Sequence, residues 1–211
     1  MGSAMRDVLD LLTSGVHDAR NQLFVAESQV VRAETEHGIR LDEARFAIEQ
    51  AALRLNRILT AYRSQRGLLT LAVDMARLGD VLDEALLVTG PHCTLAGLAL
   101  ESVCIDDDLQ WPLDRERVLD VLSNALNNAS RFARSQILLT ARRDGDELVL
   151  RVEDDGPGFD STDPAAMTQR GLGLFVACEI ARQHRHGQRC GRLLLSNGGT
   201  LGGAVFELRL P

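Results

Sequence analysis

The sequence predicts two parts of different fold class. Residues 1–75 should form an α-helical hairpin, and residues 76–211 an α/β sandwich in which helices cover one face of a mixed sheet. Three observations support this prediction. The first part carries two apolar seams with heptad spacing, and that spacing disappears after about Leu78. In the second part, Arg143-Asp-Gly-Asp146 gives a strong β-hairpin signal between two strand-like runs.

The two seams predict two long helices. The first seam advances in steps of four and three residues through Leu12, Val16, Ala19, Leu23, Ala26, Val30 and Ala33. The second follows the break at His37-Gly38 and runs through Leu41, Ala44, Ile48, Ala51, Leu55, Ile58 and Tyr62. One hairpin buries little apolar surface alone, so we expect a homodimer whose two hairpins form a four-helix bundle. The second helix should either end at the polar stretch 63–67 or run on to Met75.

The second part should alternate helices and strands. Helices are expected over residues 81–88, 114–131 and 171–184. Strands are expected within 96–105 and over 136–142, 147–153, 192–196 and 204–210.

The composition narrows the function. The 211 residues are 45% hydrophobic and 25% charged, and the net charge of −7 disfavours a broad nucleic-acid role. All 23 basic residues other than histidine are arginines, so a phosphate-binding loop of the Walker type, which needs a lysine, is excluded.

Cysteine usage and the chain start predict a cytoplasmic fragment. The four cysteines form no Cys-x-x-Cys pair and indicate reduced thiols. His184, His186 and Cys190 could be drawn as a metal cluster, but a polar helix end is the favoured interpretation. No apolar run reaches membrane-spanning length, and no signal-peptide pattern is present. The opening residues 1–5 are typical of a cloning leader, so any membrane link would lie in a sensor region outside this fragment.

His17 is a candidate nucleophile on the shoulder of the first seam. A neutral imidazole is a competent nucleophile when its lone pair is free. Asp18 could take the ring proton as an N–P bond forms, and Asn21, one turn on, could position a water for the reverse hydrolysis. On this segment alone, a solvated helix face without chemistry remains an open alternative.

A second constellation indicates a nucleotide pocket. Asn124 lies mid-helix among apolar neighbours, and its carboxamide oxygen suits Mg²⁺; Asp120 and Asn128 lie one turn to either side. Asp154, at a strand end, could accept a hydrogen bond from the amine of adenine. Two pairs of glycines complete the pocket, one pair under the base and one before a helix whose amides attract phosphate: Gly156, Gly158, Gly171 and Gly173. Singly, each motif could be a turn or a helix cap.

Together, these motifs resemble the catalytic core of sensor histidine kinases of two-component systems. The matching segments are the phosphoacceptor box His17–Leu23, the N box Leu122–Ala129, the glycine boxes Asp154–Gly158 and Gly171–Leu174, and the closing strands Leu193–Pro211. The resemblance implies that residues 1–75 are the dimerisation and phosphotransfer domain. It implies that residues 76–211 are the ATP-binding domain of Bergerat type.

The resemblance also implies a reaction, its cofactors and its partners. The γ-phosphoryl group of ATP would move to His17, with Asp18 as general base, and then to an aspartate of a response-regulator receiver domain. Asn21 would serve phosphatase activity, Asn124 would hold Mg²⁺, and Asp154 would recognise adenine. Asn128 and the four glycines would shape the pocket and its cover.

The chain departs from the family pattern at several places. Gln22 replaces a proline, so a helix bend after the histidine should be missing or milder. Asp120 replaces an asparagine, and Asn127-Asn128 replace a lysine and an aromatic residue or histidine. Only the 12 residues Phe159–Arg170 separate Gly158 from Gly171, which predicts a short ATP lid. The arginines expected to replace missing phosphate contacts are Arg131, Arg134 and Arg170.

Two other functions remain open beside the kinase. One is a histidine phosphotransferase that does not use ATP and relays phosphate between two receiver domains. The other is a dimeric structural adaptor in which His17 has no chemical role. The retained Asn124, Asp154 and paired glycines favour the kinase, whereas the short lid favours the phosphotransferase.

Overall fold

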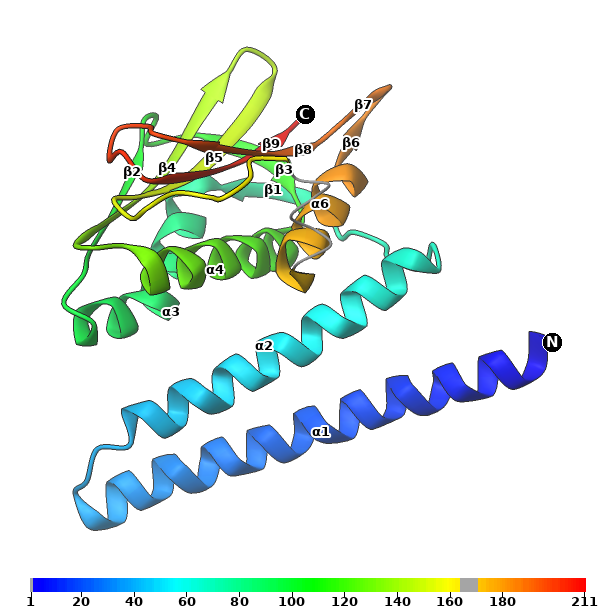
Figure 1. Ribbon diagram of the computed structural model, residues 1–211. Coiled ribbons are helices and arrows are strands. Elements are labelled where there is room, and N and C mark those ends of the chain that lie inside the picture. The colour runs from blue at the N-terminus through cyan, green and yellow to red at the C-terminus, as the bar shows by residue number, and fades with distance from the viewer. Residues whose placement is uncertain (1, 164–170) are drawn as a thin grey trace. The chain divides into compact units, whose positions relative to one another are not determined.

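The computed structural model describes residues 2–163 and 171–211, apart from the side chains of residues 2–13 and of His17. The chain divides into two compact units, Met1–Leu68 and Leu69–Pro211 (Figure 1). Within the described parts of the chain, no helix is both long enough and apolar enough to span a membrane.

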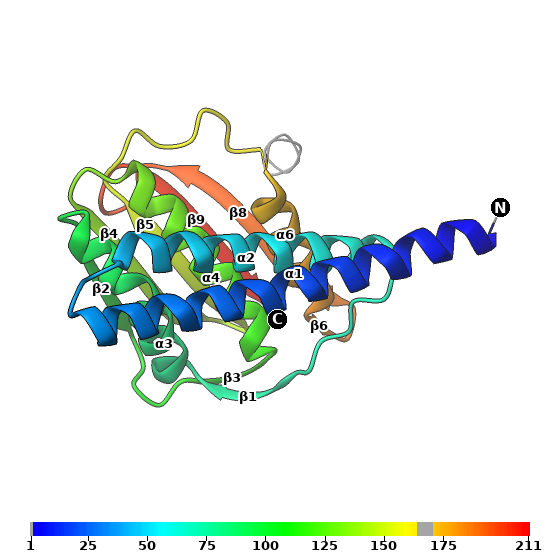
Figure 2. The same ribbon diagram turned by 90° about the horizontal axis from the view of Figure 1, so that it is seen from below.

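The first unit is a hairpin of two helices, α1 (Gly2–His37) and α2 (Asp42–Gln65), which lie side by side (Figure 2). Gly38 turns the chain with a φ of +64°, a conformation that favours glycine. Glu34 fastens this turn, because its carboxylate accepts a hydrogen bond from the Leu41 N–H at 2.8 Å. The predicted hairpin is confirmed, and several of its large apolar side chains are exposed: Phe24, Val25, Val31, Ile39 and Ile58.

The second helix ends at Gln65. The Leu68 N–H donates to the Arg63 carbonyl at 2.8 Å, and the Gly67 N–H donates to the Ser64 carbonyl at 2.9 Å. With Gly67 at a φ of +67°, these bonds form the Schellman arrangement that terminates helices. Of the two alternatives for α2, the end at the polar stretch 63–67 is therefore confirmed, and a continuation to Met75 is wrong.

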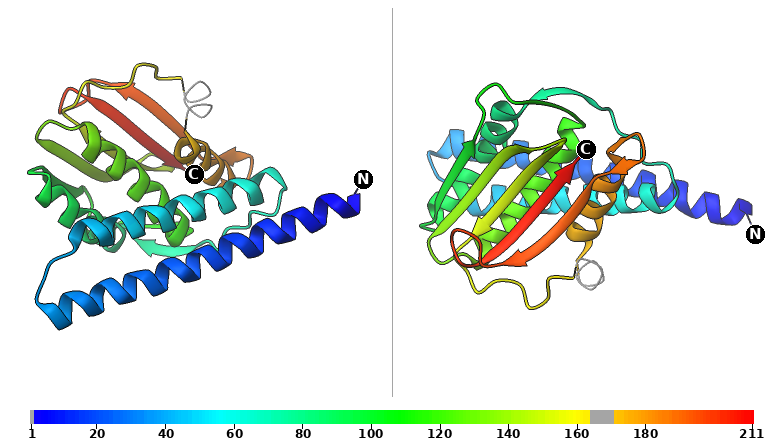
Figure 3. Two further views of the ribbon diagram at one scale, coloured as in Figure 1. Left: turned by 60° about the horizontal axis from the view of Figure 1, so that its bottom comes forward. Right: turned by 90° about the horizontal axis from the view of Figure 1, so that it is seen from above.

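The second unit is built on a five-stranded mixed sheet in the order β2-β4-β5-β9-β8. Its strands are β2 (Ala99–Cys104), β4 (Gln136–Asp144), β5 (Glu147–Asp154), β8 (Arg192–Asn197) and β9 (Ala204–Leu210). Strand β2 runs parallel to β4, and every other pairing in this sheet is antiparallel. Three helices cover one face of the sheet: α3 (Leu78–Leu95), α4 (Arg115–Phe132) and α6 (Leu172–Gln183) (Figure 3). The predicted mixed sheet with helices on one face is confirmed.

Two short strand pairs lie outside the main sheet and were not predicted. Strand β1 (Asp74–Arg77) pairs with β3 (Gln110–Leu113), and β6 (Arg185–His186) pairs with β7 (Arg189–Cys190). Strand pairs this short carry too few residues for a visible alternation of apolar and polar positions.

The core lies between the sheet and its helices. Alternate residues of β4 and β5 point into it, and opposite them stands the apolar face of α4. The fully buried members from these elements are Val118, Leu122, Leu126, Ile137, Leu139, Ala141, Leu148 and Leu150. This packing fixes the C-terminal end of β5 against the last turns of α4.

A buried hydrogen-bond network around Asp114 and His184 holds the start of α4. Asp114 caps the helix by accepting the Arg117 N–H at 3.0 Å, and its other oxygen accepts the Ala72 N–H at 2.8 Å. Its own N–H donates to Nε2 of His184 at 3.0 Å, and Nδ1 of His184 lies 2.9 Å from the Ile180 carbonyl. His184 caps the C-terminal end of α6, as the expected polar helix end, but it is buried and has a structural role in this network. Among the described residues, no group of His, Cys, Asp and Glu could hold a metal.

This hydrogen-bond network around Asp114 and His184 predicts that the free energy of unfolding depends on pH. Nε2 of His184 must accept a bond, so the ring is neutral, and burial holds the pKa of His184 below its ordinary value of 6.5. As the pH falls, His184 therefore takes up a proton in the unfolded state at a higher pH than in the folded state. The stabilisation is complete above about pH 6.5 and is lost as the pH falls from there through the lower pKa of the folded state, by at most about 1.4 kcal/mol per pH unit.

Urea denaturation between pH 7 and pH 5 measures this effect. His184→Gln should unfold more easily at pH 7 and should lose less stability on acidification than the parent protein. His186→Gln, at an exposed position, should keep the parent pH profile. Equal pH slopes in His184→Gln and the parent would refute the assignment.

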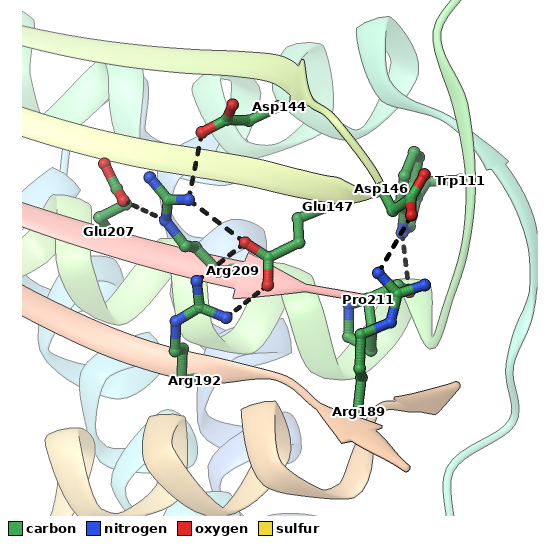
Figure 4. Close-up of polar contacts among 9 residues, drawn as sticks. All are labelled: Trp111, Asp144, Asp146, Glu147, Arg189, Arg192, Glu207, Arg209 and Pro211. Carbon is green, nitrogen blue, oxygen red and sulfur yellow. Dashed lines mark hydrogen bonds and ion pairs between the residues drawn. The ribbon is translucent and has the colours of Figure 1, made fainter. Parts of the chain in front are cut away.

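An arginine–carboxylate network ties four strand segments on the outer side of the sheet (Figure 4). Glu147 at the start of β5 accepts hydrogen bonds from Arg192 of β8 and, at 3.2 Å, from Arg209 of β9. Arg209 also pairs with Glu207 at 2.6 Å and with Asp144 of β4 at 3.1 Å. The Arg192 bonds are the main reason that the pKa of Glu147 is lowered.

Candidate functional site

A cavity of about 310 Å³ opens between α4, α6 and the ends of β5 and β9. Its wall is mostly apolar and contains three polar side chains. The lining residues are Ala125, Asn128, Ala129, Phe132, Val152, Asp154, Pro157, Gly158, Phe159, Asp160, Leu174, Ala204 and Phe206. A flat, largely apolar group with one or two polar edges fits such a lining.

Asp154 is the buried acid of this cavity, with 5% of its surface exposed. Its Oδ1 accepts hydrogen bonds from the backbone N–H groups of Gly156 at 2.8 Å and Ala204 at 3.1 Å. These two amides fix the position of the carboxylate. The sequence-predicted acid therefore lies in the cavity.

Its neighbour Asp155 has a different task. The carboxylate accepts the Ser135 hydroxyl at 2.6 Å and the backbone N–H groups of Arg134 at 2.7 Å and Ser135 at 3.0 Å. The Ser135 hydroxyl and these amides hold the pKa of Asp155 far below its ordinary value. Asp155 thus ties the turn between α4 and β4 to the end of β5.

Two predicted glycines leave no room for a side chain at the cavity. A Cβ on Gly156 would collide with the backbone carbonyl of Phe132, the last residue of α4. Gly158 has a φ of +85°, and a Cβ there would lie 2.7 Å from Oδ1 of Asn197. At position 156, close contact with the backbone favours glycine. At position 158, both close contact and the positive φ favour glycine.

Asn124 lies beside the cavity and against the first turn of α6. It is 5% exposed, and its Nδ2 has no hydrogen-bond partner among the described residues. A Cβ on Gly173 would lie 2.5 Å from Nδ2 and Oδ1 of Asn124, so a side chain at position 173 would displace the Asn124 amide. Gly171, the N-cap of α6, has open space around it. A buried side-chain amide without a partner, beside the N-terminal turn of a helix, fits a ligand that supplies the missing bond.

The other pocket predictions have mixed outcomes. Asn128 lines the cavity one turn after Asn124. Asp120 forms an ion pair with Arg117 at 3.3 Å on the same helix. The Arg131 guanidinium lies 5.9 Å from the ring centre of Phe132, a cavity residue. Arg134 is exposed, and Arg170 lies outside the described residues together with most of the predicted lid.

Asn197 is a site residue that the sequence analysis missed. Its carboxamide accepts the Phe159 N–H at 2.7 Å and donates to the Phe159 carbonyl at 2.9 Å. The two residues are 38 positions apart, so no local pattern connects them. The only signal was the Asn-Gly-Gly turn at residues 197–199.

The candidate phosphoacceptor residues lie on α1 of the first unit. The backbone of His17 is helical, while its side chain lies outside the described residues. Asp18 and Asn21 are exposed on the same helix, and α1 continues unbroken through Gln22. Just after them, a groove of about 820 Å³ runs between α1 and α2. Its lining is Ala19, Gln22, Leu23, Ala26, Phe46, Ala47, Gln50, Ala51, Arg54 and Leu55.

Comparison with known proteins gives relatives for much of the chain. Residues 113–211 match the family described as histidine kinase-, DNA gyrase B-, and HSP90-like ATPase. The sensor protein kinase CarS of Pseudomonas aeruginosa is 32% identical over 145 residues, which cover 64% of this chain and 30% of CarS. The virulence sensor histidine kinase PhoQ of Salmonella typhimurium is 29% identical over 118 residues, which cover 51% of this chain and 23% of PhoQ. The chain thus spans less than a third of the length of these relatives.

Solved structures give the same fold. The histidine kinase AdeS of Acinetobacter baumannii has a TM-score of 0.63 at 20% identity, over 90% of this chain and 95% of AdeS. Full-length ShkA in complex with AMPPNP has a TM-score of 0.67 at 20% identity, over 96% of this chain and 45% of ShkA. Residues 113–211 thus match the histidine kinase-, DNA gyrase B-, and HSP90-like ATPase family, and the chain is similar to sensor histidine kinases over 64% of its length.

Proposed function

We propose that this chain is the catalytic core of a histidine kinase that phosphorylates His17 with ATP and passes the phosphoryl group to an aspartate of a receiver domain. The observation that carries the proposal is the buried carboxylate of Asp154 in a mostly apolar cavity, with Oδ1 held by two backbone amides. Adenine matches this cavity, since it is flat and apolar and carries one amine that can donate to a carboxylate.

The phosphates of the nucleotide have a matching place beside the cavity. With the base at Asp154, they extend towards Asn124 and the first turn of α6. The N-terminal turn of a helix attracts negative charge. Gly173 supports this arrangement, because a larger residue would displace Asn124.

Asn124 also suits Mg²⁺. Rotating its carboxamide by half a turn exchanges the partnerless Nδ2 for an oxygen, which is the hard ligand that Mg²⁺ prefers. When bound, Mg²⁺ neutralises charge on the phosphate oxygens. Asn124 would orient the phosphates, and the apolar wall would keep water from the base.

On the first unit, His17 is the proposed acceptor. A ring nitrogen of His17 attacks the γ-phosphorus, the bond from this phosphorus to the bridging oxygen breaks, and ADP leaves. Asp18 takes the ring proton. An aspartate oxygen of the receiver domain then attacks the phosphohistidine and frees the imidazole. Asn21 would position a water that hydrolyses the phosphorylated receiver.

Dimerisation through the helical hairpin belongs to this proposal. Phe24 is 68% exposed, Val25 53% and Ile58 47% in the single chain. Apolar exposure of this extent on a two-helix unit is typical of a surface that another chain covers. A second copy would complete a four-helix bundle and bury it. Residues 1–75 would then be the dimerisation and phosphotransfer domain.

Incubation with γ-labelled ATP and Mg²⁺ tests the proposal. Acid-labile label should appear on the parent protein and fall to background in His17→Ala, because no other group takes its place. His37→Ala, at the end of the same helix, should be labelled like the parent.

Two results would count against a kinase. Label that persists in His17→Ala would place the acceptor elsewhere. A protein that neither binds ATP nor becomes labelled, yet accepts phosphate from a phosphorylated receiver, would be an ATP-independent phosphotransferase.

A further inference from the structure

One wall of the cavity is made by a segment without regular secondary structure. Phe159 and Asp160 line the cavity just after Gly158, where the chain has left β5. The backbone of such a segment has no strand or helix partner that would hold it in one place. A wall that contacts a ligand needs a fixed position to contribute to affinity, since ordering it on binding costs conformational entropy.

Asn197, the last residue of β8, supplies the missing partner. Its Oδ1 accepts the Phe159 N–H at 2.7 Å, and its Nδ2 donates to the Phe159 carbonyl at 2.9 Å. The side chain thus pairs with both backbone groups of one residue, as a neighbouring strand would. It also lies over Gly158, where any Cβ would approach its amide to 2.7 Å.

The same loop also fixes Asp154. Asn197 stands opposite Ala204 in the pairing of β8 with β9, and the Ala204 N–H donates to Oδ1 of Asp154. Between them, the Gly198 N–H donates to the Gly203 carbonyl at 2.8 Å, and the Gly203 N–H donates to the Asp154 carbonyl at 3.0 Å. One short loop, residues 197–204, therefore holds both the acid and the wall of the cavity.

We infer that Asn197 is a positioning residue of the nucleotide pocket, which sets Phe159 at a fixed place beside Asp154. This inference rests on the proposed binding of an adenine nucleotide. Asn197 acts on the nucleotide through Phe159, and its two hydrogen bonds organise the pocket before the ligand arrives.

Titration calorimetry with ADP tests this role on three variants of the full chain. Asn197→Ala loses both bonds and should bind ADP about tenfold more weakly, as expected for the loss of two exposed hydrogen bonds. Asn197→Asp has the same shape and keeps the acceptor for the Phe159 N–H, but sets a carboxylate oxygen against the Phe159 carbonyl. It should bind ADP at least as weakly as Asn197→Ala. Ser196→Ala, the exposed neighbour on β8, should bind like the parent.

Two further measurements separate positioning from general stability. Amide hydrogen exchange at Phe159 should accelerate in Asn197→Ala without nucleotide, while the melting temperature of the variant stays close to that of the parent. Parent-like ADP affinity in Asn197→Asp would overturn the inference, as would unchanged exchange at Phe159. A melting temperature that falls in step with affinity would show a structural role instead. A parent protein without ADP affinity would refute the proposed function itself, whatever the exchange at Phe159 shows.

Discussion

Asp154→Asn should lose most of its affinity for ADP while the protein remains folded. The two amides that donate to Oδ1, from Gly156 and Ala204, require an oxygen at that position. The asparagine side chain must therefore present its NH₂ group to the amine of adenine. Both groups are hydrogen-bond donors, so no hydrogen bond can form between them. Losing a charged hydrogen bond and gaining an unfavourable contact should together cost about 3 kcal/mol, on the order of a hundredfold in Kd.

The same argument predicts a change of base preference. Hypoxanthine has a carbonyl oxygen where adenine has its amine, so Asp154→Asn should bind inosine diphosphate more tightly than ADP. Calorimetric titrations of both nucleotides measure the reversal. Asp160→Asn, which changes an exposed acid of the same cavity, should keep the preference for ADP. If Asp154→Asn still prefers ADP, Asp154 does not contact the base amine.

Gly156→Ala should destabilise the second unit by about 3 kcal/mol, near the upper end of the cost of inserting a methyl group into a packed site. The added Cβ would collide with the carbonyl oxygen of Phe132 and lie 3.0 Å from the carbonyl carbon. Both atoms are backbone at the end of α4, so no side-chain rotation relieves the contact. The shift should also move Asp154, whose Oδ1 would lie 3.0 Å from the new atom.

Urea denaturation of the variant measures this loss. Gly79→Ala is the matched control, because Gly79 lies in α3 with an ordinary φ and nothing within 4 Å of an added Cβ. It should match or slightly exceed the parent in stability, since alanine favours helices. Equal stability of both variants would mean that Phe132 and Gly156 are not in close contact.

The sequence predicted most of the elements because they carry strong local signals. The heptad seams predicted α1 and α2, and the Asp-Gly turn predicted the β4–β5 hairpin. The end of α2 was ambiguous, because the Schellman bonds of Gly67 and Leu68 depend on a backbone conformation that composition alone does not specify. The burial of His184 at the end of α6 was missed for a related reason. Its Nε2 accepts a buried hydrogen bond from the backbone N–H of Asp114, which is 70 residues away in sequence.

Some residues of the site stand in motifs that are visible in the sequence, and others meet only in the folded chain. Asp154, Asn124 and the glycines stand in compact motifs, and the structure brings Asn128, Asp154 and Gly158 to one cavity. Site residues whose contact partners are far away in sequence form no such motif. Asn197 and Phe159 meet only because β8 and β5 are both paired with β9. Neither residue is unusual in its own segment.

The order of the strands has a consequence for synthesis. Strand β9 is made after every other strand of the main sheet, yet it lies between β5 and β8. Until β9 leaves the ribosome, β8 has no partner in this sheet, and Asp154 lacks the amide of Ala204. Nascent chains that stop before residue 204 should therefore be unable to bind nucleotide. The pairing of β9 with β5 closes a loop of some fifty residues, which is a slow step in folding. Nucleotide binding thus becomes a property of the finished domain, and no partial chain can compete for ATP.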